Sequence, residues 1–438
     1  MAGTDRGDLT RTAILALLGT VGPLSRTEIA RELDLSPASV TQLTRELMGY
    51  GMLEELDLKP SRGGRPAQRL GLVGSAGRAL GVKVTADHLV LVDVRLDGEV
   101  LGAWECAFDP SSPEALDRLA DAVESVVSGT GHGLTARTPT STGDGQVPPL
   151  LGIGVGVPGS VEDQAVGTVN APTLGWQAMP VGERLRRRLK LPVLVENDVN
   201  ALAAAERLYG RGRTHRDFLV LTIGRGVGAA IVADGRVYRG ARGGAGEFGH
   251  VPVDPAGPVC GCGARGCLEA YVGSAGLLAA ALAKNGGSAS SPEGAGSVPE
   301  SAGFPEGAGS AGGRSAAVTA LGRAGAAGDL VAREVFAEAG AVLGRAAAGL
   351  INVVDPEVVV VLGEGTADWP LWQAGFDPAV RAQLYPGRRD ISIEVESWDD
   401  TSWAQGAAAL VLATPFDAAG AAGEQGRLVR ARLIGTTP

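Results

Sequence analysis

Three cysteines and one histidine lie close together near the middle of this 438-residue chain. His250 is followed by Cys260, Cys262 and Cys267, and the glycines between them allow the backbone to turn closely. One imidazole and three thiolates make a complete tetrahedral ligand set for zinc, with no position left open for water. The pattern therefore predicts one structural zinc ion rather than a catalytic one. A group of ordinary buried thiols is the alternative, but such close spacing favours a metal over both thiols and disulfides.

Small polar and basic residues near the N-terminus indicate a second kind of chemistry, the binding of DNA. A capping box at Ser25 and Glu28 predicts a helix over 27–33, and Ser36 with Pro37 begins a second helix that runs to about residue 49. The outward side chains of the second helix are short or polar, as insertion into the major groove requires. The candidate DNA-contacting residues of this helix are Ser36, Ser39, Thr41, Gln42 and Arg45.

The segment 53–72 is predicted to form a two-stranded wing. Its tip carries Lys59, Arg62, Arg65 and Arg69 and no acidic residue, which suits contact with phosphates or with the minor groove. A generic helical hairpin followed by a solvated basic loop is the alternative. The position of the basic tip favours a winged helix-turn-helix, so we expect a DNA-binding domain over residues 1–75.

Composition limits the remaining possibilities. The chain is 45% hydrophobic, which predicts a packed globular protein, and its net charge of −10 argues against nonspecific coating of nucleic acid. The first residues lack the apolar segment of a secretory signal, and no apolar run approaches the roughly 20 residues of a membrane span. We therefore expect a cytoplasmic protein without membrane contact.

Short apolar segments alternate with amphipathic ones between residues 76 and 412, and this alternation predicts an α/β domain. Strands are predicted near 89–94, 151–157, 193–195, 218–223 and 358–362, and helices near 113–127, 181–189, 198–209, 329–352 and 401–412. Residues 285–315 are rich in Gly, Ser, Pro and Ala and are predicted to be a disordered insertion. Residues 413–438 are predicted to be a flexible tail, and residues 131–149 a shorter loop.

Several motifs in this region resemble those of the ROK family, named for repressors, open reading frames and sugar kinases. They are GEFGH at 246–250, CGCGARGCLE at 260–269, ENDVNA at 196–201, VPG at 157–159, APTLGW at 171–176 and IGRGVG at 223–228. The resemblance covers about 78–412 and implies a two-lobed ribonuclease H-like fold, the fold of actin-like ATPases and sugar kinases. A winged helix before this domain is the arrangement of the family's repressor branch.

The resemblance also implies a sugar site lined by Asn197, Asp198, Glu247, His250 and Glu269. Carboxylates and amides suit sugar hydroxyls, each of which donates and accepts a hydrogen bond. His250 would serve twice, with one ring nitrogen on zinc and the other directed at the sugar, so the metal would brace the binding wall. Family members often carry Asn where this chain has Thr173, which leaves the identity of the sugar open.

Asp198 matches the catalytic base of the family's kinases, which hold ATP phosphates with D-x-G-G-T on the first hairpin. The equivalent stretch here, LGVKVTADH at 80–88, has no paired glycines, and the added Cβ atoms would obstruct close approach of a phosphate. We therefore expect no catalytic residue, with Asp198 kept as a sugar ligand.

The main hypothesis is a sugar-responsive transcriptional regulator that binds double-stranded operator DNA as a homodimer or homotetramer. A repressor is favoured, and an activator with the same architecture is the alternative to a repressor. The first alternative is a glucokinase-like, ATP-dependent sugar kinase with a DNA-binding appendage. The second alternative is a zinc-dependent interaction module with a vestigial pocket.

Overall fold

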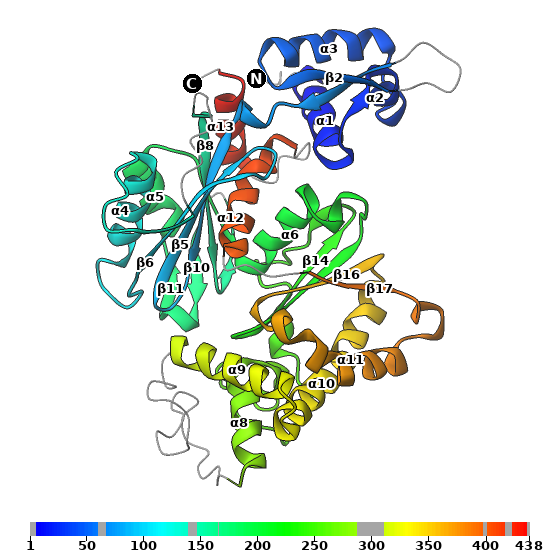
Figure 1. Ribbon diagram of the computed structural model, residues 1–438. Helices are drawn as coiled ribbons and strands as arrows, with labels where there is room; N and C mark the ends of the chain where they lie inside the picture. The colour runs from blue at the N-terminus through cyan, green and yellow to red at the C-terminus, as the bar shows by residue number, and fades with distance from the viewer. Residues whose placement is uncertain are drawn as a thin grey trace. The chain divides into compact units, whose positions relative to one another are not determined.

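The computed structural model describes residues 6–59, 67–138, 147–164, 166–286, 311–396, 401–416 and 423–435. The chain divides into two compact units, one formed by 1–214 together with 401–438 and the other by 215–400 (Figure 1). The first unit holds a winged helix and one α/β lobe, and the second unit holds another α/β lobe. The predicted fold class is therefore confirmed, although the winged helix packs into the same unit as the first lobe.

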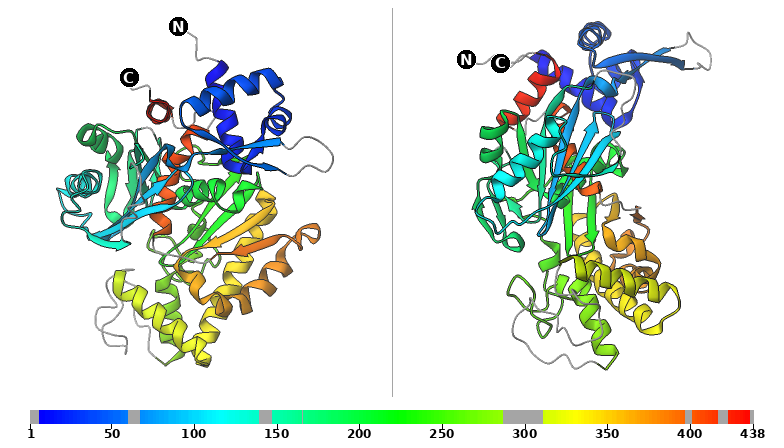
Figure 2. Two further views of the ribbon diagram at one scale, coloured as in Figure 1. Left: turned by 45° about the horizontal axis from the view of Figure 1, so that its top comes forward. Right: turned by 60° about the vertical axis from the view of Figure 1, so that its left-hand side comes forward.

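The winged helix is built as its capping residues predict. Ser25 forms the complete capping box with Glu28, and the Ser36 side chain accepts the Ser39 N–H. Leu70 of the wing joins Val40 and other buried residues of the helices in one core. The wing strands and the helices of this domain, drawn in blue, lie together in both views of Figure 2. The three strands of this domain pair in the order β1-β3-β2. The elements are α1 (Arg6–Val21), β1 (Leu24–Ser25), α2 (Arg26–Glu32), α3 (Pro37–Gly49), β2 (Leu53–Lys59) and β3 (Ala67–Leu72).

The lobe of the first unit has a six-stranded sheet in the order β12-β8-β4-β5-β6-β7. An antiparallel hairpin, β4 with β5, adjoins two parallel strands, β8 and β12. Helices cover both faces, α4 and α5 on one and α6 and α12 on the other (Figure 1). The elements are η1 (Gly74–Ala76), β4 (Arg78–Val84), β5 (His88–Arg95), β6 (Val100–Ala107), α4 (Ala115–Val127), β7 (Thr135–Thr138), β8 (Leu150–Val157), α5 (Val181–Leu189), β12 (Val193–Asn197), α6 (Asp198–Leu208), η3 (Arg211–Arg213) and α12 (Ser402–Leu412).

A small antiparallel sheet, in the order β11-β10-β9, completes this lobe. Its elements are β9 (Ser160–Val161), β10 (Val169–Ala171), η2 (Pro172–Leu174) and β11 (Trp176–Met179). The APTLGW motif therefore runs from the last residue of β10 through η2 into β11.

The prediction of a flexible tail after residue 413 is wrong. The chain continues through η7 (Thr414–Phe416) to a helix, α13 (Gly423–Leu433). Val429 is fully buried in the same core as the winged helix, and the Gln425 side chain accepts the N–H of Val193 at 3.3 Å. Arg430 donates to the carbonyl of Thr414 at 3.2 Å. The helix α13 is largely polar in composition, and the burial of a few residues together with these hydrogen bonds attaches it to the first unit.

The second unit repeats the plan of the first lobe. In its sheet, β15-β14-β13-β16-β17, an antiparallel hairpin again adjoins two parallel strands. This duplication is what the ribonuclease H-like prediction requires. The elements are β13 (Phe218–Ile223), β14 (Val227–Ala233), β15 (Arg236–Val237), η4 (Phe248–His250), α7 (Glu269–Val272), α8 (Ser274–Lys284), α9 (Ala311–Ala326), α10 (Leu330–Val354), β16 (Val358–Leu362), η5 (Glu364–Asp368), α11 (Trp369–Gln383), η6 (Pro386–Arg388) and β17 (Ser392–Val395).

Two predicted loops contain regular structure. The predicted insertion over 285–315 overlaps α9, which begins at Ala311, while residues 287–310 lie outside the described residues. The predicted loop over 131–149 contains β7, which pairs with β6. Within the described part of the chain, α10 is the one helix long and apolar enough to cross a membrane. Its Val335, Phe336 and Leu343 lie in the core of the second unit. A helix buried in a protein core can have the same length and apolar composition as one that crosses a membrane.

Candidate functional site

The four predicted metal ligands come together in the second unit. The ligand atoms of His250, Cys260, Cys262 and Cys267 all lie within 4.8 Å of one another. The His250 Nδ1 is 3.6 Å from the Cys260 Sγ, and the two other sulfur atoms are 3.7 Å apart. A tetrahedron with zinc–sulfur bonds of about 2.3 Å has sulfur–sulfur edges of about 3.8 Å. The cluster could therefore hold a metal ion.

Tight turns of the backbone bring these ligands together. The N–H of Cys260 donates to the carbonyl of Ala264 at 2.7 Å, and Pro252 bridges to Cys267. Gly266 has a φ of +65°, and a Cβ there would lie 1.5 Å from the carbonyl oxygen of Asp254. A side chain at this glycine would therefore disrupt the loop that carries the cysteines.

The predicted sugar ligands of the second unit surround this cluster. The Nε2 of His250 faces Glu247 Oε2 at 3.8 Å, on the other side of the ring from the cysteines. Glu269 follows the last cysteine closely and begins α7, and its Oε2 accepts the N–H of Val227 at 3.1 Å. That carboxylate also lies beside Gly249, the neighbour of His250. Glu247, His250 and Glu269 thus form a polar group attached to the metal loop.

The glycine-rich IGRGVG motif at 223–228, which connects β13 and β14, also lies against carboxylates. Oε2 of Glu364 is 2.1 Å from the point where a Cβ on Gly224 would lie, and Oε2 of Glu269 is 2.5 Å from that point on Gly226. The Ser274 hydroxyl donates to the carbonyl of Gly224 at 3.0 Å. Carboxylates this close to the loop disfavour a phosphate there, because like charges repel.

In the first unit, a buried carboxylate holds the ENDVNA motif in place. Glu196 is 1% exposed, and its Oε1 accepts the backbone N–H of Asn197 at 2.8 Å and the side-chain amide of Asn200 at 3.3 Å. Its Oε2 accepts from Gln164 at 2.6 Å. Sequence reasoning did not single out Glu196. Its place at the end of a buried strand, directly before the predicted ligands, was the available signal.

Asn197 uses most of its hydrogen-bonding capacity inside the protein. Its Oδ1 caps α6 by accepting the N–H groups of Val199 at 2.9 Å and Asn200 at 3.1 Å. Its Nδ2 donates to the carbonyl of Gly159 at 3.1 Å. An amide nitrogen has two hydrogens, so one remains for a ligand. Nearby, the hydroxyl of Thr173 donates to the carbonyl of Pro158 at 3.3 Å.

Asp198 is paired with a cation that the sequence did not reveal. Lys83 of β4 donates to its Oδ2, and the N–H of Val199 donates to its Oδ1 at 2.9 Å. Asp198 and Lys83 are each 7% exposed. A buried charge needs a partner of opposite sign, and each of these residues supplies one to the other.

At the tip of the β4–β5 hairpin, the backbone N–H groups that a phosphate would need already donate to a side chain of the same turn. The hydroxyl of Thr85 accepts the N–H of His88 at 3.0 Å and of Asp87 at 3.4 Å. The carboxylate of Asp87 then faces the ring of His88 at 2.7 Å. The polar groups of this turn therefore bond to one another, and the carboxylate of Asp87 places a negative charge at its tip.

The predicted DNA-contacting residues lie along one exposed face of α3. Ser36, Ser39, Thr41, Gln42 and Arg45 are all exposed. Thr44 lies on the opposite face, fully buried, where it accepts from Arg26 Nε at 3.1 Å. Arg62 and Arg65 at the wing tip lie outside the described residues.

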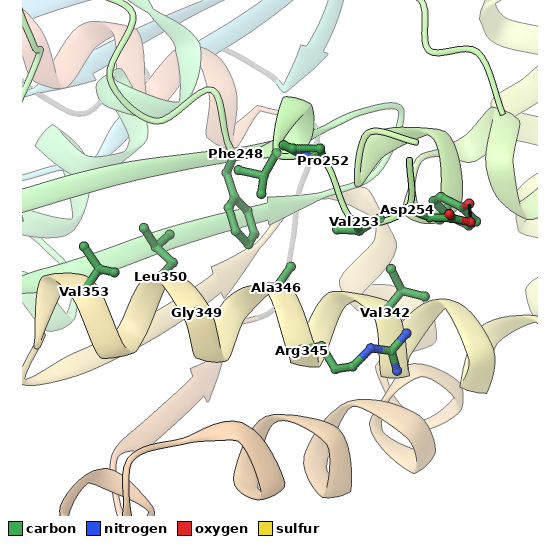
Figure 3. Close-up of a pocket in the computed structure, with 12 residues that line it drawn as sticks. Phe248, Pro252, Val253, Asp254, Val342, Arg345, Ala346, Gly349, Leu350 and Val353 are labelled. Carbon is green, nitrogen blue, oxygen red and sulfur yellow. Dashed lines mark hydrogen bonds between the residues drawn. The ribbon is translucent and has the colours of Figure 1, made fainter. Parts of the chain in front are cut away.

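A separate apolar groove of about 620 Å³ lies in the second unit, between α10 and the segment that leads from His250 (Figure 3). Phe248, Pro252 and Val253 face Ala346 and Leu350 across it (Figure 3). None of the five predicted sugar ligands lines this groove. Its apolar lining does not suit a polyol.

A DNA-binding module joined to a two-lobed α/β domain of the sugar-kinase type, with a His/Cys cluster, defines the class of this protein. Residues 141–414 match the ROK family, and residues 12–57 match the IclR helix-turn-helix domain. The first match covers more than half of the chain, and the chain belongs to the ROK family.

Named relatives include regulators. The xylose repressor of Caldicellulosiruptor bescii is 32% identical over 257 residues, which cover 58% of this chain and 61% of that repressor. The match therefore spans less than two thirds of the repressor's length. The DNA-binding transcriptional dual regulator NagC of Escherichia coli is 27% identical over 406 residues, which cover 92% of each protein.

Two similar solved structures are a transcriptional regulator and a glucokinase. A ROK family transcriptional regulator, a homolog of the E. coli MLC protein, superimposes with a TM-score of 0.75 at 25% identity over 98% of this chain and 99% of that one. A ROK family glucokinase from Streptomyces griseus, in complex with glucose and AMPPNP, superimposes with a TM-score of 0.60 at 28% identity over 76% of this chain and 99% of that one. The regulator thus matches nearly the whole chain, winged helix included.

Proposed function

We propose that this protein is a sugar-responsive, DNA-binding transcriptional regulator that represses genes of carbohydrate uptake or catabolism. The observation that carries the proposal is the exposed polar face of α3 in a chain whose remainder is a ROK domain. Polar side chains on a helix that follows a tight turn suit readout of base edges in the major groove. Arg62 and Arg65 of the wing would add phosphate contacts.

The effector in this proposal is a sugar or a sugar derivative. Asn197 and Asp198 of the first unit and Glu247, His250 and Glu269 of the second would bind its hydroxyls. The free amide hydrogen of Asn197 supplies a donor and the carboxylates supply acceptors, so both functions of a hydroxyl are matched. Binding would shift the equilibrium between two conformations of the regulator through its different affinity for each.

The metal in this proposal is a structural zinc ion, one per chain, held by His250, Cys260, Cys262 and Cys267. Burial raises the pKa of the Cys260 thiol to about 12, so a cation is what would stabilise its thiolate at neutral pH. Zinc with four protein ligands performs no chemistry of its own. It would fix the ring of His250, whose Nε2 remains directed towards Glu247.

The proposal excludes sugar phosphorylation as the main activity. A general base takes up a proton, but a proton on Asp198 would neutralise the buried carboxylate that pairs with the Lys83 ammonium. Asp87 and Glu364 place negative charge at the two loops that would hold ATP phosphates. The alternative is a glucokinase-like enzyme with a DNA-binding appendage, which the likeness to the S. griseus glucokinase favours.

We further propose that the regulator acts in the cytoplasm as a homodimer or homotetramer. Two winged helices related by a twofold axis would contact two half-sites of one operator.

A gel-shift titration tests the proposal. A DNA fragment from upstream of the protein's own gene is bound by the full chain and titrated with D-xylose, D-glucose and N-acetyl-D-glucosamine. Sugar-dependent release of the DNA supports a repressor. A coupled ATP-hydrolysis assay with the same sugars tests the alternative, and turnover that disappears in Asp198→Asn would overturn the regulator proposal.

A further inference from the structure

The ammonium of Lys83 contacts the first turns of two helices. Its Nζ donates to Asp198, the first residue of α6. The same nitrogen lies 4.4 Å from the ring centre of Trp403, the second residue of α12. Ion pairing and attraction to the aromatic face together hold the buried cation. A change at the carboxylate therefore changes the contact with the ring.

The two helices are packed too closely to move independently. Gly81 of β4 lies against α12, where an added Cβ would come within 1.8 Å of the carbonyl oxygen of Ala404. On another side of α12, Gly406 lies against α6, where a Cβ would be 3.0 Å from the backbone nitrogen of Leu202. Interiors packed to this density respond as rigid bodies. A displacement at the start of α12 is therefore carried along both helices.

Both helices lead to the winged helix. Both α6 and η7, which follows α12, contact α1. Ile14 and Leu18 of α1 share one apolar cluster with Leu208 of α6 and Leu412 of α12. A continuous packed connection thus runs from Lys83 to the first helix of the DNA-binding domain.

We propose that Lys83 is the positioning residue through which the sugar site acts on the winged helix. The inference rests on the proposed function, because it takes Asp198 as the ligand of a sugar hydroxyl. A hydroxyl that donates to Asp198 shares the carboxylate with Lys83 and weakens its attraction to the ammonium. The ammonium then moves relative to Trp403, and α12 with α6 shifts against α1. The ligand class is a polyol with a hydroxyl at Asp198.

Removal of the Trp403 ring tests this connection and leaves the Lys83–Asp198 pair intact. The full chain and Trp403→Leu are compared for sugar affinity by calorimetry and for operator affinity with and without the sugar that releases the wild type. We expect the sugar affinity measured without DNA and the operator affinity measured without sugar each to stay within about threefold of wild type. The ratio of operator affinities without and with sugar, about 5–150-fold for typical allosteric coupling, falls to about twofold or less.

Two further variants separate coupling from stability. Trp403→Phe keeps an aromatic face and retains most of the ratio, and Trp104→Leu, at a half-buried tryptophan of β6, retains all of it. An unchanged ratio in Trp403→Leu, or an equal loss in Trp104→Leu, overturns the inference. If Trp403→Leu does not fold, the sugar-induced change in tryptophan emission decides, and a change of unaltered size in Trp403→Phe overturns it. Failure of all three sugars to affect DNA binding by the wild type instead overturns the proposed function.

Discussion

The imidazole of His250 lies between the cysteine cluster and Glu247, with Nε2 3.8 Å from the carboxylate oxygen of Glu247. The position of one ring would therefore set the geometry of both the proposed metal ligands and the proposed sugar ligands. In the proposed function, sugar binding would depend on a metal that need not touch the sugar.

Removal of a metal ligand should consequently weaken sugar binding. We expect Cys262→Ser to lose bound zinc and to bind sugar about 10–100-fold more weakly, as for the loss of groups that orient a metal ligand. Zinc content by mass spectrometry and sugar affinity by calorimetry measure the two effects. Cys106→Ser, at the cysteine outside the cluster, serves as the control. Full sugar affinity in zinc-free Cys262→Ser would contradict the bracing role.

Loss of a cation from the exposed face of α3 should weaken operator binding. Arg45→Ala is expected to cost about 1–3 kcal/mol, the value of a good base contact. Arg187→Ala, on the exposed surface of α5 with only a 3.6 Å ion pair to Glu183, is the matched control. Fluorescence anisotropy with operator DNA measures both variants. Equal effects of the two substitutions would show that Arg45 contributes general charge and not a specific contact.

Loss of the buried carboxylate of Glu196 should disorder the sugar ligands beside it. Glu196→Gln replaces an acceptor with a donor opposite the amide donors of Asn200 and Gln164. We expect a loss of about 1–3 kcal/mol in unfolding free energy, together with weaker sugar binding. Glu124→Gln, at an exposed acid of α4, should leave both unchanged. Urea denaturation and calorimetry measure the two quantities, and a wild-type sugar affinity in folded Glu196→Gln would remove its positioning role.

A methyl group at Gly154 of β8 should disrupt the packing of α12 against the sheet. An added Cβ would come within 1.8 Å of the carbonyl oxygen of Ala407. We expect Gly154→Ala to lower the unfolding free energy by about 1–3 kcal/mol or more, since overpacking forces the backbone to shift. Gly349→Ala, in α10, has nothing within 4 Å of the new atom and should be neutral or slightly stabilising. Thermal denaturation that ranks the two variants the other way would contradict this packing.

Asp93 should make stability depend on pH. Burial raises the pKa of Asp93 above its ordinary value of 3.8, and Arg78 only partly opposes this. The folded chain then keeps this proton to a higher pH than the unfolded chain. Its contribution to stability is full below about pH 4 and declines as the pH rises through the folded-state pKa. Relative to wild type, Asp93→Asn should gain unfolding free energy as the pH increases over this window, measured by urea denaturation. A difference that does not change with pH would contradict the raised pKa.

Local patterns predicted the features that depend on local sequence. The capping residues Ser25 and Ser36 define the helices that they begin, and the spacing of the cysteines defines the metal cluster. In both cases the interacting groups lie within a few turns of backbone, so spacing constrains their geometry.

The features that sequence reasoning missed depend on distant contacts. Lys83 and Asp198 are separated by 115 residues, and the pairing of both β4 and β12 with β8 brings them together. The helix α13 was predicted as a tail because its few apolar residues give no marked pattern, and Val429 is buried by residues that are distant in the sequence. Tertiary burial, which a single sequence does not display, decided both.

The discontinuity of the first unit has a consequence during synthesis. The DNA-binding domain leaves the ribosome before the second unit, but α12 and α13, which share its apolar core, leave after the second unit. A nascent chain can therefore complete the second unit before the first is finished. We expect chains that end before residue 401 to leave Ile14 and Leu18 without part of their packing. Such chains would therefore leave the DNA-binding domain less completely packed than in the full chain.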